Sequence, residues 1–181
     1  MKTFFWIDLE MTGLDEKVDH ILEVAVTITQ MDLHPLETFH RVVHQPAEVL
    51  AQMNDWCKKA HKDSGLASMI PQGMPLAQVE AELLSFTNRY YNEKDQIVLA
   101  GNSVGNDRRF IEKYLPAFAK RLHYRLIDVS SFKEVFREKY NLKFEKKNAH
   151  RATDDILESI RELKFYLSFV QPPDIAHATQ T

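Results

Sequence analysis

Two carboxylates, Asp8 and Glu10, stand on either side of one leucine in the otherwise apolar stretch TFFWIDLEM. In a β-strand, side chains two residues apart point to the same face and lie roughly 6.5 Å apart. Carboxylates that close repel one another, and one of them takes up a proton unless a cation lies between them. Mg²⁺ and Mn²⁺ prefer carboxylate oxygens, so the pair is a candidate metal site. The ordinary alternative is the solvated outer face of an edge strand.

A third carboxylate, Asp107, follows the apolar run QIVLAG through the small-residue turn NSVGN. The pattern puts Asp107 at the start of a helix, where a site at the end of a strand would find another ligand. A helix N-terminus also favours a carboxylate electrostatically. By itself, Asp107 is therefore better explained as an ordinary first-turn acid.

A histidine and an acid mark the start of the last helical pattern, because His150 precedes it and Asp155 follows five residues later. Five residues turn an ideal helix by about 500°, so the two side chains would not share a face if both were helical. We expect His150 on the preceding loop and Asp155 in the first turn. Asp154 is the alternative ligand or a helix cap, and a single histidine before a helix is more often a surface residue than a base.

The elements that position these side chains follow from residue patterns, since β-branched and aromatic runs indicate strands and helical spacing of apolar residues indicates helices. The expected strands cover residues 3–9, 21–31, 38–44, 96–101 and 125–129, and a loop covers 64–73. The expected helices cover residues 47–62, 75–92, 107–122 with an interruption near Pro116, 130–140 and 153–170. This order predicts an α/β fold with a mixed sheet flanked by helices. Ligands of such sheets lie beyond the carboxyl ends of strands.

The length of 181 residues fits a single domain, expected over residues 1–170, with a disordered polar tail over 171–181. The formal net charge is -3, from 23 basic and 26 acidic residues. This balance argues against a protein that grips long nucleic acid by general electrostatics, so an anionic partner must be held locally.

The sequence also predicts a cytoplasmic location. Cys57 is the only cysteine, so no internal disulfide can form and a reducing compartment is expected. The apolar run at the N-terminus is interrupted by Asp8 and Glu10, which is not typical of a signal peptide. No other stretch is long and apolar enough to span a membrane.

The combined motifs resemble the DEDD exonucleases, in the subgroup whose last motif contains a histidine. Segments similar to those of the oligoribonucleases run from about Thr3 to Leu167, in the order WIDLEMTGL, MNDWCKKAH, GNSVGNDRRF, YRLIDVSS and AHRATDDILESI. The resemblance implies a ribonuclease-H-like fold and a homodimer. It also implies removal of 5′-mononucleotides from the 3′ end of very short RNAs, especially dinucleotides.

The resemblance also implies a role for each matching residue. Two divalent ions, Mg²⁺ or Mn²⁺, would be held by Asp8, Glu10, Asp107 and Asp155, and His150 would be the general base. The implied substrate contacts are Leu14 as a wedge, Trp56 against a base, His61, Ser103, Arg125 and Ser130 on the 5′-terminal phosphate, and Tyr124 from the partner subunit. Core packing is the ordinary alternative for Trp56, although the polar run NDWCKKAH favours the base contact. Without the family, Leu14 is explained by core packing or a turn, and Tyr124 and Arg125 by a place at the surface near a strand end.

Two other functions are compatible with the motifs. One is a broader DEDD exonuclease that trims DNA or longer RNA ends. The other is a non-catalytic module that binds short nucleotides. The five catalytic positions all carry functional residue types, which favours an enzyme, and turnover of a bound dinucleotide with metal separates the alternatives.

Overall fold

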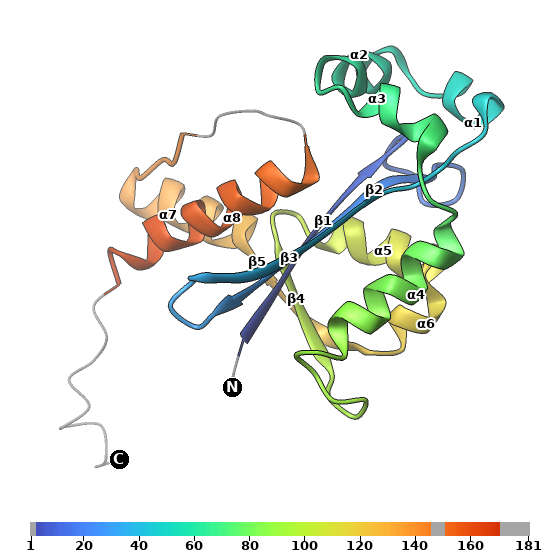
Figure 1. Ribbon diagram of the computed structural model, residues 1–181. Helices are drawn as coiled ribbons and strands as arrows, with labels where there is room; N and C mark the ends of the chain where they lie inside the picture. The colour runs from blue at the N-terminus through green and yellow to red at the C-terminus, as the bar shows by residue number, and fades with distance from the viewer. Residues whose placement is uncertain (1–2, 146–150, 171–181) are drawn as a thin grey trace.

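A five-stranded mixed sheet forms the centre of the fold in the computed structural model, which describes residues 3–145 and 151–170 (Figure 1). The strands are β1 (Thr3–Met11), β2 (Ile21–Gln30), β3 (Pro35–Val42), β4 (Ile97–Gly101) and β5 (Leu122–Asp128), in the order β3-β2-β1-β4-β5. The first three strands pair antiparallel, and β4 and β5 run parallel to β1. The carboxyl ends of β1, β4 and β5 therefore meet at one edge of the sheet.

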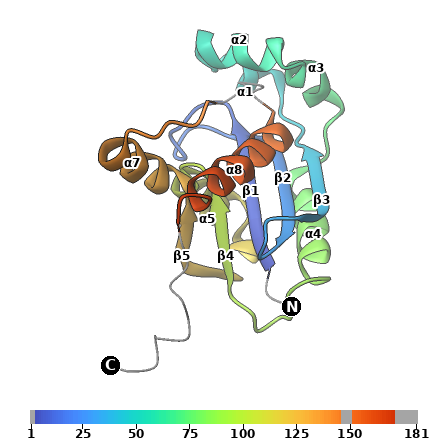
Figure 2. The same cartoon turned by 90° about the vertical axis from the view of Figure 1, so that its left-hand side faces the viewer.

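Helices cover both faces of the sheet (Figures 1 and 2). On one face lie α4 (Leu76–Thr87), α5 (Gly105–Tyr114) and α6 (Pro116–Ala119), and on the other lie α7 (Val129–Tyr140) and α8 (Ala152–Leu167). Alternate side chains of β1 point to opposite faces of the sheet, so the strand contributes to the hydrophobic clusters on both faces. Phe5, Ile7 and Leu9 pack in the larger cluster with α4, α5 and α6, whereas Trp6 packs in the cluster formed with α8. The even-numbered face of β1, which carries Asp8 and Glu10, is thus the face that α8 covers.

Small residues let α8 come close to the sheet. Ala25 on β2 and Ala100 on β4 are fully buried, and they share a cluster with Trp6 and with Ala152 and Ile156 of α8. The helix lies across β1 and β2 in the view of Figure 2. The residues at its first turn are therefore brought over the acidic part of β1.

A group of short helices stands at one end of the sheet: α1 (Ala47–Ala51), α2 (Asp55–Asp63), α3 (Leu66–Met69) and the 3₁₀ helix η1 (Ile70–Gln72). The prediction of one helix over 47–62 is wrong, since Asn54 starts a new helix by accepting a hydrogen bond from the Cys57 amide at 2.8 Å. The prediction of a loop over 64–73 is also wrong. Leu66 and Ile70 are fully buried, and their packing outweighs the glycine and proline signals.

The other expected elements are confirmed, with ends displaced by a few residues. β1 extends to Met11, β3 begins at Pro35, and α5 ends before Pro116 as expected. The expected tail over 171–181 lies outside the described residues. Within the described part of the chain, no helix combines the length and the apolar character needed to cross a membrane.

Truncating a buried side chain on the face away from α8 should destabilise the fold without touching the acidic face. Leu83 of α4 is fully buried in the larger cluster. We expect Leu83→Ala to lower the free energy of unfolding by roughly 2–5 kcal/mol, because it removes buried methyl groups and leaves a cavity. Urea denaturation measures this change, and an unchanged midpoint would contradict the assigned core.

Candidate active site

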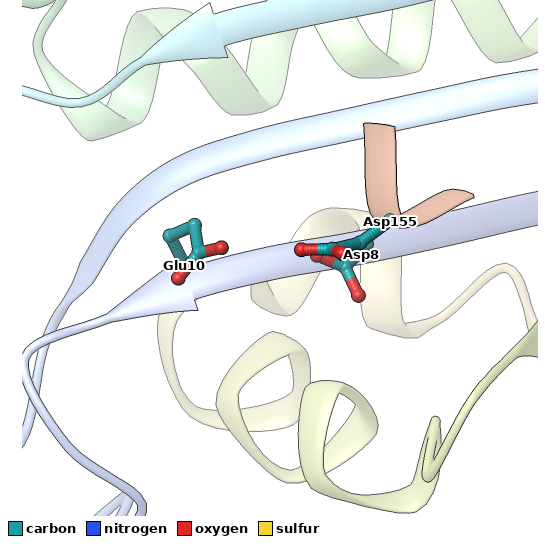
Figure 3. A group of neighbouring side chains, drawn as sticks. All are labelled: Asp8, Glu10 and Asp155. Atoms are coloured by element: carbon teal, nitrogen blue, oxygen red, sulfur yellow. The ribbon is translucent and has the colours of Figure 1, made fainter. Parts of the chain in front are cut away.

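Three carboxylates meet where the first turn of α8 crosses β1 (Figure 3). Asp8 and Glu10 come from the same face of β1, and Asp155 comes from the first turn of α8, as the sequence spacing predicts. Each offers one carboxylate oxygen, and these oxygens lie within 4.8 Å of one another. All three side chains are half-buried, so the cluster is open on one side.

Asp107 lies beside this cluster and is tied to the strand that carries it. It is buried in the first turn of α5, and its Oδ1 accepts a hydrogen bond of 2.9 Å from the backbone N–H of Leu9. Leu9 stands between Asp8 and Glu10 on β1. The same backbone segment therefore fixes Asp8, Glu10 and Asp107 relative to one another.

Burial and neighbouring charges raise the pKa values of Asp8, Glu10 and Asp107. Burial raises the pKa of Asp8 well above its usual range, and the charges of Asp107, Glu10 and Asp155 raise it further. Burial, followed by the charges of Asp155, Glu23 and Asp107, raises the pKa of Glu10 to about 8, although Arg151 opposes this. Burial raises the pKa of Asp107 to about 7 despite the hydrogen bond from Leu9. A site of three neighbouring carboxylates with raised pKa values favours a positive charge among them.

The donor set fits a hard divalent cation. Asp8, Glu10 and Asp155 offer only carboxylate oxygens, and these converge from two elements. Mg²⁺ and Mn²⁺ favour such ligands and keep water in their remaining positions, which suits a cluster that is open on one side. A bound cation would also relieve the repulsion that raises the pKa values of Asp8 and Glu10.

A cavity of about 410 Å³ adjoins the acids, with Glu10 in its wall. Leu14 and Trp56 line it although both are strongly exposed, with 69% and 66% of their surface accessible. Two large apolar side chains beside an acidic cluster do not fit the explanation by core packing. His61 also lines this cavity but is 2% exposed.

His61 of α2 contacts the end of β1, the strand that carries Asp8 and Glu10. Its Nε2 lies 2.9 Å from the carbonyl oxygen of Met11, and its Nδ1 lies 3.8 Å from Oε2 of Glu10. The side chain thus links α2 to the end of β1. The cavity and the acidic cluster are held together at this point.

Four further predicted residues lie near the carboxyl ends of β4 and β5 or along β5. The hydroxyls of Ser103 and Ser130 are 3.0 Å apart, and the backbone N–H of Ser103 donates to both Ser130 and Asp128. Ser103 adopts a φ of 51°, which is uncommon for a residue other than glycine. On the edge strand β5, Tyr124 is 72% exposed and its hydroxyl accepts a hydrogen bond of 3.1 Å from Arg125.

His150 lies outside the described residues. Sequence patterns missed several residues at the site, among them Gly13, Asn54 and Glu23. Gly13 and Asn54 line the cavity, and Glu23 is fully buried opposite Glu10. Only Glu23 left a usable signal, because it is the single charge in the apolar strand ILEVAVTITQ.

Solved structures share this architecture. The exonuclease I of Methylocaldum szegediense superposes with a TM-score of 0.74 at 15% identity, over 96% of this chain and 42% of its own. Escherichia coli exonuclease I in complex with a dT13 oligonucleotide superposes with a TM-score of 0.69 at 15% identity, over 93% of this chain and 41% of its own. These similarities confirm the ribonuclease-H-like fold with a mixed sheet flanked by helices. At this identity they concern the fold alone.

Comparisons of sequence identify the family of the chain. The exonuclease family model RNase_T matches residues 5–163. The mitochondrial oligoribonuclease of Homo sapiens is 48% identical over 167 residues, which cover 89% of this chain and 70% of that protein. The oligoribonuclease of Leifsonia xyli is 45% identical over 175 residues, which cover 93% of this chain and 84% of that protein. Fold and acidic site thus define a nuclease of the exonuclease class, and the chain belongs to the oligoribonuclease family.

The raised pKa values predict an unusual pH dependence of stability in the metal-free protein. The folded state keeps the proton of Glu10 up to about pH 8, whereas the unfolded chain loses it near the ordinary pKa of 4.5. The folded state binds more protons in this window, so its stability falls as the pH rises from about 5 to about 8. With chelator present, we expect a melting temperature several degrees lower at pH 8 than at pH 6, and added Mn²⁺ should reverse the loss.

Differential scanning fluorimetry measures this effect. Glu10→Gln should flatten the decline, because it removes one titrating group with a raised pKa. Glu93→Gln, at an exposed acid before β4, should leave the decline unchanged. A metal-free protein equally stable at pH 6 and pH 8 would contradict the interpretation.

Proposed function

We propose that this chain is a 3′→5′ exoribonuclease that degrades very short RNAs, dinucleotides above all, to 5′-mononucleotides. The observation that carries the proposal is the position of Glu10, which belongs both to the acidic cluster and to the cavity lined by Leu14 and Trp56. A phosphate at the acids and a base in the cavity would be bound side by side. Family membership supports the same reaction.

The acids would hold two divalent ions, Mg²⁺ or Mn²⁺, with Asp8, Glu10, Asp107 and Asp155 as the ligands. Bound divalent ions neutralise the scissile phosphate and make a nearby water more acidic. His150 would take the proton of that water, since the ordinary pKa of histidine suits a general base near neutral pH. That role stays a prediction, because His150 lies outside the described residues.

The cavity would bind the terminal base by stacking. Trp56 offers an exposed aromatic face, and Leu14 faces the same cavity from the loop after β1. Every base has a π-face, so such a contact tolerates any sequence. Buried His61, which the motifs assigned to the 5′-phosphate, contacts Glu10 and Met11, and the phosphate role stays a prediction.

The length preference would come from a phosphate cap. Ser103 and Ser130 form a hydroxyl pair at the carboxyl ends of β4 and β5, and a guanidinium such as that of Arg125 can hold a phosphate through two hydrogen bonds. Tyr124 is exposed on the edge strand β5, which suits a residue that each subunit of a homodimer would donate to the site of its partner. A cap of this kind lets a protein of net charge -3 bind RNA without a long basic groove.

We further infer a single exonuclease domain over residues 1–170 and a cytoplasmic location. The broader exonuclease and the non-catalytic module remain the alternative functions. A length series of RNA substrates separates all three.

A length series of 5′-labelled RNAs from two to about twenty nucleotides, with Mn²⁺ or with chelator, tests the function. We expect dinucleotides to be cleaved fastest, and only with metal. Asp8→Asn should reduce kcat at least a thousandfold, because it removes a charged ligand without changing the side-chain shape. Arg125→Ala should slow dinucleotide cleavage most and so abolish the length preference.

Each alternative predicts a different pattern in that series. Equal rates on long and short RNAs would refute the phosphate cap and indicate a general exonuclease. Tight binding of dinucleotide without cleavage would leave only the binding module. Circular dichroism of Asp8→Asn and Arg125→Ala verifies that both variants are folded.

Removing the exposed indole tests the base-binding cavity. Base stacking on an aromatic side chain contributes roughly 1–3 kcal/mol. Trp56→Ala should therefore raise KM for a dinucleotide by roughly tenfold to a hundredfold. Met69→Ala, at an exposed apolar residue on α3 outside this cavity, should leave KM unchanged. Equal KM values for wild type and Trp56→Ala would refute the stacking role.

A further inference from the structure

Glu23 is a fully buried carboxylate on β2, next to the acidic cluster. It stands directly opposite Glu10 in the antiparallel pairing of β1 and β2. Like charges directly opposite one another destabilise a sheet. Glu23 also raises the pKa values of Asp8 and Glu10. An acid in this position needs a compensating interaction to be retained.

The compensation comes from the start of α8. Arg151 donates to Oε1 of Glu23 from Nη2 at 2.6 Å and from Nε at 3.0 Å, and the backbone N–H of Ala152 donates to Oε2 at 3.0 Å. His40 of β3 adds a contact of 2.6 Å to Oε1. Burial raises the pKa of Glu23, but these hydrogen bonds outweigh it and hold the pKa at about 2. Glu23 is therefore ionised, and both of its carboxylate oxygens take part in hydrogen bonds.

These contacts replace the cap that α8 lacks. The first N–H groups of a helix have no partner within the helix, and a side chain at the N-cap normally accepts from one of them. The N-cap of α8 is Arg151, which makes no such bond. The Glu23 carboxylate on β2, the strand that lies beneath α8, accepts the hydrogen bond of the first amide instead. Its negative charge also suits the positive end of the helix dipole.

Backbone hydrogen bonds in the first turn of α8 connect Arg151 to Asp155. The backbone N–H groups of Asp154 and Asp155 both donate to the carbonyl oxygen of Arg151 at 2.9 Å. Arg151 is thus held by Glu23 through its side chain and bonded to Asp155 through its backbone. Asp155 lies three residues beyond Ala152, about 4.5 Å along the helix axis. A displacement of the anchor would carry the Asp155 carboxylate with it.

We propose that Glu23 is a positioning residue that fixes the first turn of α8 and thereby holds Asp155 against Asp8 and Glu10. The inference rests on the proposed function only in taking these acids as metal ligands. Removing either partner should weaken metal binding, because the first turn of α8 then loses its anchor on β2.

Glu23→Gln is the most informative variant. Both oxygens of Glu23 accept hydrogen bonds from α8, and a glutamine of the same shape can replace only one of them. Losing an outer contact that orients a metal ligand typically costs 10–100-fold in metal affinity or activity. We expect the Mn²⁺ dissociation constant, measured by isothermal titration calorimetry, to rise at least tenfold. With a dinucleotide, kcat should fall at least tenfold while KM changes less than twofold.

Leu83→Ala is the matched control for stability, because it weakens the fold from the opposite face of the sheet. At a temperature where both variants are folded, it should keep the wild-type Mn²⁺ affinity and kcat. Arg151→Met should reproduce the losses of Glu23→Gln, and the double variant should lose little more, since the two residues act as one unit.

Wild-type Mn²⁺ affinity and kcat in Glu23→Gln would overturn the inference, as would equal losses in Leu83→Ala. Additive losses in the double variant would overturn the paired action of Glu23 and Arg151. A wild-type protein that binds Mn²⁺ but leaves dinucleotides intact would overturn the proposed function alone, because the calorimetric comparison still decides the role of Glu23. A wild-type protein that binds no Mn²⁺ would overturn both.

Discussion

Repulsion among carboxylates is the constraint on which the rest of this structure depends. Asp8, Glu10 and Asp155 bring oxygens within 4.8 Å of one another on a sheet face that a helix covers. Burial and mutual repulsion raise the pKa values of Asp8 and Glu10, so the metal-free arrangement is intrinsically unfavourable. A divalent cation removes the conflict. The surrounding elements must therefore hold the acids in place for the cation and the substrate.

Hydrogen bonds from several distant segments provide this support. Asp107 of α5 accepts from the Leu9 backbone, and His61 of α2 contacts the end of β1. Asn102, just after β4, donates to Ser159 and Glu162 in the middle of α8. With the anchor at Glu23, α8 is fixed both at its first turn and along its length. Each acid thus belongs to an element that is tied to its neighbours independently of the metal.

The loop that carries Leu14 is held in the same way. The Asp19 carboxylate accepts from the Thr12 hydroxyl at 2.8 Å and from the Asp15 backbone at 3.0 Å. A Cβ added at Gly13 would lie 2.4 Å from Oδ2 of Asp19, so a larger residue there would displace the Asp19 carboxylate. The loop is therefore closed around one carboxylate. Leu14 can be strongly exposed and still be presented to the cavity in a defined position.

The sequence by itself determined the features that depend on a few neighbouring residues. Alternation on a strand places Asp8 and Glu10 on one face, and the spacing from His150 places Asp155 in a first turn. The broad α/β order followed from the same local periodicities. The motifs also predicted Trp56 as a substrate contact, and its exposure beside Glu10 supports that role.

Only the tertiary structure decided how distant segments meet. Glu23 and Arg151 are 128 residues apart in the chain, and no local sequence pattern predicts that they pair. The buried Leu66 and Ile70 formed helical turns where glycine and proline predicted a loop. Periodicity reports which face a side chain takes, because backbone geometry sets it within a few residues. Partners are chosen by burial and charge compensation, which depend on how the whole chain packs.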